Sequence, residues 1–229
     1  MPGEIRHEYR EELVRLEEGA LGAFDLVAVA LDRTLLAVEH RDSELARQVA
    51  NDDDRLDGRY LEIHQGLIAL LATQSPVATD LRLIAALLHV IKNVERMGDQ
   101  CVNIAKLIPL SGHEPPIREE VLARLLRMGA CARSEVSQSK RAFTERNTEL
   151  AEDLVRQDRE INRLNREVFK IAIEVGDDPD TREWAMHMTM VARALERVGD
   201  NAVDVGEQAV FVATGLFREF SSPSSSLPQ

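Results

Sequence analysis

Cysteine and aromatic residues are scarce in this chain of 229 residues. Its two cysteines, Cys101 and Cys131, form no Cys-x-x-Cys pair, so neither a disulfide framework nor a thiolate zinc site is expected. Aromatic residues make up 4% of the chain, which leaves few stacking platforms for single-stranded nucleic acid. The net charge is -12, and no basic cluster is present to neutralise phosphates. We therefore expect no nucleic-acid partner.

Long apolar runs are also missing. No stretch approaches the ~18 uncharged apolar residues of a membrane span, because Arg82, His89 and Lys92 interrupt the longest candidates. Residues 1–15 are charged throughout and lack the apolar core of a secretory signal. These absences lead us to expect a soluble, cytoplasmic protein with no direct membrane insertion.

Apolar residues recur at helical spacing along most of the chain, without strand-like alternation. The expected helices span residues 4–38, 43–73, 76–107, 117–145, 148–175 and 180–217. Proline and glycine between Pro109 and Pro116 mark the interior linker. The pattern predicts an all-α fold of six long helices. Its expected parts are a first unit at 1–110, a linker at 111–116, a second unit at 117–220 and a disordered Ser/Pro-rich tail at 221–229.

A Glu-Arg-x-Gly-Asp box occurs twice, at 95–99 and at 196–200, with an offset of 101 positions. Residues 41–46 match residues 146–151 at an offset of 105. The change of offset from 105 to 101 places the length difference in the turn between the second and third helices of each half, at 74–76 and 176–179. A period near 100 is typical of a duplicated domain, and short connections make successive helices antiparallel. The sequence therefore predicts two tandem, pseudo-symmetric three-helix bundles.

Acids stand in both halves where a buried seam of apolar residues is expected. They are Asp53, Asp57, Glu95 and Asp99 in the first half and Asp158, Glu196, Asp200 and Asp204 in the second. Antiparallel packing would bring each set together, and buried carboxylates are strongly unfavourable unless cations compensate them. Oxygen ligands without Cys or His favour Mg, Ca, Mn or Fe. The repeated pattern favours cation sites over chance.

Two plainer interpretations stay open at this point. In the first, nearby arginines hold the acids, and the candidates are Arg55, Arg96, Arg159 and Arg197. In the second, the seams face solvent. Among metal-based alternatives, a carboxylate-bridged di-iron enzyme would need Glu-x-x-His motifs, which the chain lacks. A metal-storage bundle is the other alternative.

The duplicated boxes, together with Gln74-Ser75-Pro76-Val77-Ala78 and Asp80-Leu81-Arg82 between them, resemble the PhoU family of bacterial phosphate-signalling regulators. The resemblance covers residues 9–214. It implies two three-helix bundles, a homodimer, and a cytoplasmic negative regulator of phosphate uptake and of the phosphate regulon rather than an enzyme. The implied partners are the ATPase subunit of the phosphate ABC transporter and the phosphate-sensing histidine kinase, with peripheral attachment at the inner face of the membrane.

The resemblance also implies metal ions such as iron, zinc, manganese or magnesium, singly or in multinuclear clusters. Carried over by position, the first site comprises Asp53, Asp57, Glu95 and Asp99, with Asn103 nearby, and the second comprises Asp158, Glu196, Asp200 and Asp204. Asn162 departs from the family pattern at the place of the second acid of its box. Because Asn offers a carbonyl oxygen but no charge, the second site is expected to be weaker or to hold fewer ions.

Overall fold

The computed structural model describes residues 2–111 and 118–220, and within these ranges every regular element is a helix. The elements are α1 (Pro2–His40), α2 (Ser43–Asn51), α3 (Asp54–Thr73), α4 (Ala78–Leu107), the 3₁₀ helix η1 (Pro109–Ser111), α5 (Glu119–Glu145), α6 (Thr148–Ile173) and α7 (Pro179–Thr214). The predicted all-α fold is confirmed. Most of the predicted linker and the whole predicted tail lie outside the described residues.

The second of the six predicted helices, expected at 43–73, is interrupted by a short turn and consists of α2 and α3. Asp52 and Asp53 form a turn between α2 and α3, where the amides of Arg55 and Leu56 donate to carbonyls three residues back, at 3.2 and 2.8 Å. Three successive aspartates repel one another and are poor helix formers, which accounts for the break. The turn places Asp53 at the start of α3, facing α4.

The corners between the first two helices of each half have the same construction. Arg41 and Arg146 adopt left-handed backbone conformations, with φ of 53° and 52°. Asp42 and Asn147 then cap the following helices by accepting hydrogen bonds from backbone amides, at 2.9–3.0 Å. These matching corners confirm the offset of 105 through α1 and α5 as well as through the helices that follow.

Local capping interactions define both ends of the last helix, α7. Asp178 accepts a hydrogen bond from the Thr181 amide at 2.8 Å, and Pro179 occupies the first turn of α7. The helix ends at Thr214 rather than near 217, because Gly215 adopts a φ of 77° at its C-terminus.

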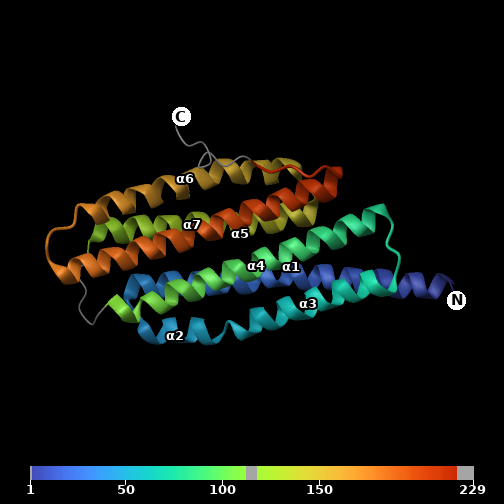
Figure 1. The fold of residues 1–229 in the computed structure, drawn as a ribbon, viewed down its shortest axis with the longest axis horizontal. Helices are drawn as coiled ribbons and strands as arrows, with labels where there is room; N and C mark the ends of the chain where they lie inside the picture. Colours follow the sequence, from blue (N-terminus) through green and yellow to red (C-terminus); the bar gives the residue numbers. More distant parts are fainter. Residues whose placement is uncertain (1, 112–117, 221–229) are drawn as a thin grey trace.

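The two halves lie side by side with their helices along the long axis of the molecule (Figure 1). Helix α4 packs against α7 and α1 packs against α5, so the buried residues of both halves join in one core. The central helices α4 and α7 are buried along most of their length. None of the described helices combines the length and apolarity needed to span a bilayer.

Candidate functional site

The first carboxylate cluster lies where the α2–α3 turn meets α4. Burial raises the pKa of Asp53 to about 6, and the charges of Asp57, Asp99 and Glu95 add to this in that order. Burial also raises the pKa of Asp99, with further contributions from Glu95 and Asp57. The charges of all four predicted acids therefore act on Asp53, Asp99 or both. Asp57 is exposed and the other three are half-buried.

The second cluster occupies the corresponding place between α6 and α7, and it is more deeply buried. Asp158 is 2% exposed, and one of its oxygens accepts a hydrogen bond from the Asn162 amide nitrogen. Burial raises the pKa of Asp158 to about 7, with the charges of Asp200 and Glu196 next in importance. Burial and Glu196 likewise raise the pKa of Asp200. The Asn162 amide thus holds one oxygen of the Asp158 carboxylate within the cluster.

Glu135 on α5 belongs to this cluster and was missed by the sequence analysis. Its side chain is fully buried, and both carboxylate oxygens lack a hydrogen-bond partner among the described residues. Burial, followed by the charges of Asp158 and Asp200, raises its pKa to about 9. The signal that could have identified it is its place in a buried helical stripe, which contains Leu125, Met128, Ala132, Glu135 and Ser139.

Asp204 and Asn103 differ from the remaining candidates. Burial raises the pKa of Asp204, while Arg96 of α4 is the strongest influence in the opposite direction. Asp204 therefore faces the contact between the two halves, although its charge still contributes to the raised pKa of Asp200. Asn103 is exposed on α4.

The cations closest to the clusters are not, in the main, the predicted arginines. Lys92 donates to both carboxylate oxygens of Glu95 at 2.8 Å, and Arg193 pairs with Glu196. Lys92 and Arg193 occupy equivalent positions at the offset of 101. Of the four arginines considered, Arg197 lowers the pKa of Asp200 and Arg96 lowers that of Asp204. One cation in each half pairs directly with one glutamate, and burial together with the neighbouring acids still raises the pKa values of Asp53, Asp99, Asp158 and Asp200.

The chemistry of these residues fits a hard cation, since the clusters offer carboxylate and amide oxygens. Asp158 has one buried oxygen without a partner in the described structure, in addition to the two of Glu135. Gly199 leaves room beside them, because a Cβ there would lie 2.8 Å from an oxygen of each residue. In the described ranges no three such side chains already surround one point as a metal site. A bound cation would therefore require rotamer changes.

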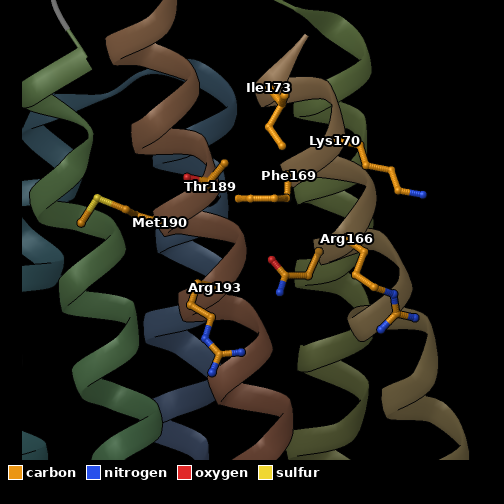
Figure 2. Close-up of a pocket in the computed structure, with 8 residues that line it drawn as sticks. Arg166, Phe169, Lys170, Ile173, Thr189, Met190 and Arg193 are labelled. Atoms are coloured by element: carbon orange, nitrogen blue, oxygen red, sulfur yellow. The ribbon is translucent and has the colours of Figure 1, made fainter. Parts of the chain in front are cut away.

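A second feature is an open groove between α6 and α7 (Figure 2). Phe169 extends from α6 toward Thr189 of α7, with Ile173 one turn away. Phe169, Ile173 and Met190 are each more than half exposed. The remaining lining residues are polar or basic: Asn165, Arg166, Lys170 and Arg193. This surface is apolar at its centre and positively charged along its edge.

At the corresponding positions of the first half, aromatic and basic side chains contact one another. Tyr60 and His64 stand at the positions of Asn165 and Phe169, and their rings lie 5.5 Å apart. Lys92, the counterpart of Arg193, has its Nζ 4.9 Å from the centre of the Tyr60 ring. The first half therefore has an aromatic pair and a cation–π contact at positions where the second half has the groove residues Asn165, Phe169 and Arg193.

Curated relatives match this chain over most of its length. A phosphate-specific transport system accessory protein PhoU homolog from Aquifex aeolicus is 31% identical over 90% of this chain and 92% of its own. PhoU homolog 1 from Mycobacterium leprae, named in the same way, is 28% identical over 94% of this chain and 96% of its own.

Two solved structures share the fold. The phosphate transport system regulatory protein PhoU from Streptococcus pneumoniae superposes with a TM-score of 0.85 at 26% identity, over 93% of this chain and all of that one. PhoU from Pseudomonas aeruginosa gives 0.82 at 25% identity, over 91% of this chain and all of that one. The PhoU domain model matches residues 21–108 and 125–209, each match containing one Glu-Arg-x-Gly-Asp box. The chain belongs to the PhoU family.

Proposed function

We propose that this chain is the accessory regulator of a phosphate-specific transport system. The names of its relatives support this role. In the proposed mechanism, the protein acts in the cytoplasm as an adaptor. It contacts the ATPase subunit of the phosphate ABC transporter and the phosphate-sensing histidine kinase, and it restrains uptake and keeps the phosphate regulon repressed when phosphate is plentiful. We assign it no catalytic step.

The open groove between α6 and α7 is the observation that best supports an adaptor. Exposed apolar side chains such as Phe169 and Ile173 gain free energy when a partner covers them. Within the described residues, Arg166 and Lys170 form no ion pair, so they are free to meet acids on that partner. We propose that an apolar segment flanked by acidic residues, on the transporter ATPase or on the kinase, occupies the groove.

We further propose that the two carboxylate clusters bind metal ions. A cation would remove the repulsion among acids whose pKa values are raised by burial and by one another. Asp53, Asp57, Glu95 and Asp99 would hold it in the first half, and Asp158, Glu196, Asp200 and the Asn162 carbonyl in the second. The cation would supply structural or sensory charge compensation. A homodimer, as implied by the family resemblance, is also part of this proposal.

Deletion of the gene tests the regulatory role. A deletion strain grown in plentiful phosphate should express a phosphate-regulon reporter at the level seen in starvation. The wild-type gene should restore repression. A variant with Ile173→Ser and Phe169→Ser should not, provided that it accumulates to the wild-type level. Continued repression in the deletion strain would refute the regulatory proposal. Light scattering of the purified protein tests the homodimer.

Elemental analysis of the purified protein tests the metal proposal. Wild-type protein should carry stoichiometric iron, zinc, manganese or magnesium after dialysis, and a variant with Asp99→Ala and Asp200→Ala should lose it. A mass-spectrometric measurement that finds no metal in wild-type protein, even after reconstitution, would remove the metal proposal. The adaptor role would then depend on the helix surfaces alone.

A further inference from the structure

Glu135 is a buried carboxylate that no sequence motif assigns to a site. It is fully buried on α5, and neither oxygen has a hydrogen-bond partner within residues 2–111 and 118–220. One of its oxygens faces the space over Gly199, which Asp158 also borders. An unpaired buried charge is strongly unfavourable, so the position requires a compensating ligand or a proton.

The first half gives an internal comparison. At the offset of 105, fixed by the matching corners at Arg41 and Arg146, Glu135 corresponds to Ala30. Where the second half holds Glu135, the first half has a hollow of about 230 Å³ lined by Ala30, Asp53, Gly98 and further residues.

The same offset of 105 relates the second helical segments of the two halves, where Asp53 corresponds to Asp158. Asn162 corresponds to Asp57, so the second half has lost one acid from α6. It has gained one acid on α5 at the same cluster, because Glu135 and Asp158 each place an oxygen 2.8 Å from the position of a Cβ on Gly199. Each cluster therefore contains four carboxylates. The fourth lies on α3 in the first half, as Asp57, and on α5 in the second half, as Glu135.

We propose that Glu135 supplies the carboxylate that Asn162 lacks, so that the second half binds a divalent cation with ligands from α5, α6 and α7. The proposal rests on the metal-binding part of the proposed function and makes it specific. In it, Glu135 and Asp158 use their unpartnered oxygens, and Asp200 turns toward them. This site is enclosed by three helices, whereas the first site is built from α3 and α4 and is open at Asp57.

The proposal reverses the expectation that the second site is weaker. Both sites contain the same number of carboxylates, and the second is more buried, where electrostatic attraction to a cation is stronger. Once Glu135 has lost its proton, the second site should therefore bind its ion at least as tightly as the first site and release it more slowly to a chelator.

The experiment isolates the second site in full-length protein. In a background with Asp53→Asn and Asp99→Asn, one Mn²⁺ should bind, as measured by isothermal titration and by electron paramagnetic resonance of the free ion. Adding Glu135→Gln, which keeps the shape of the side chain, should weaken binding at least about tenfold. Glu119→Gln, an exposed acid on the same helix, should change nothing.

A charge-relocation variant gives the sharper test. Combining Glu135→Ala with Asn162→Asp recreates the arrangement of the first half and should recover Mn²⁺ binding that Glu135→Ala alone removes. Circular dichroism and thermal unfolding check that each variant folds.

If the isolated second site binds Mn²⁺ equally well with Glu135→Gln, the role of Glu135 is refuted while metal binding stands. If Mn²⁺ binds in wild type but not in the first-site background, this inference fails alone. If wild type binds no Mn²⁺ at either site, both fail.

Discussion

Glu135 of α5 and Asp158 of α6 approach the same point on α7, since a Cβ on Gly199 would lie 2.8 Å from an oxygen of each. Three helices of the second half thus meet at a backbone position that has no side chain. Gly98 has the same place in the first half, where a Cβ would collide with Leu56 at 2.2 Å. The glycine of the Glu-Arg-x-Gly-Asp box therefore has a packing role beside each cluster.

Gly199→Ala should destabilise the protein. The added methyl group meets Asp158 and Glu135, and overpacking of this kind costs about 1–3 kcal/mol, against a gain of up to about 1 kcal/mol in helix propensity. Urea unfolding measures the difference. Gly58→Ala is the matched control, because a Cβ at that helical position contacts nothing within 4 Å and should stabilise the chain. Equal effects of the two changes would contradict this packing role.

The stability of the metal-free protein should decrease as the pH rises. The pKa of Glu135 is raised from 4.5 to about 9 by burial and by Asp158 and Asp200, so the folded state keeps a proton that the unfolded chain has released. Its contribution is complete below the unfolded pKa and is lost as the pH rises through the folded pKa, by up to about 1.4 kcal/mol per pH unit.

Urea unfolding between pH 5.5 and 9, in the presence of a chelator, measures this slope. Glu135→Gln should flatten it, because an amide carries no titrating proton. Asp158, whose pKa is raised to about 7, should leave a smaller slope of the same sign at the lower end of the range. An identical slope in wild type and in Glu135→Gln would show that Glu135 is not the responsible group.

Metal should raise the melting temperature of wild-type protein. A cation that binds only the folded state at 100 times its Kd adds about 2.7 kcal/mol for each site, or roughly 5–10 °C in a chain of this size. Differential scanning calorimetry with and without Mn²⁺ gives the shift, and a chelator should reverse it. Asp99→Asn combined with Asp200→Asn should remove most of it. An unchanged shift in that variant would place the stabilising ion elsewhere.

Ile173→Ser should weaken partner binding at least about tenfold, the loss expected when a buried contact of 1.4 kcal/mol or more is removed. Its side chain is 67% exposed, so the free energy of unfolding should change by less than about 0.5 kcal/mol. Biolayer interferometry against the purified transporter ATPase subunit and the cytoplasmic part of the kinase measures the binding. Ile68→Ser, at the equivalent place in the first half, should leave it unaffected.

The sequence identified what depends on spacing within one helix. Glu95 and Asp99, and their counterparts Glu196 and Asp200, lie four residues apart, so a shared face followed directly from helical geometry. The repeat and its register were equally visible, because matching motifs preserve the order of the elements. The turn at Asp52 and Asp53 was not anticipated, since apolar periodicity continues across it.

Contacts between helices distant in the sequence were harder to predict. Glu135 joins a cluster formed by residues more than 20 positions away, and this depends on how α5 is rotated against α6 and α7. Asp204 fits the helical spacing of the second box, yet Arg96 of the other half acts on it. The packing of α4 against α7 determines that contact, and periodicity along one helix carries no information about it.

The packing of α4 against α7 and of α1 against α5 also bears on how the chain arose. A single repeat cut out of this protein would leave the face of α4 that now lies against α7 uncovered in water. Such a half would gain stability if a second copy of itself covered that face. The expected ancestor is therefore a dimer of one repeat, whose two-fold axis would correspond to the pseudo-symmetry of the present chain.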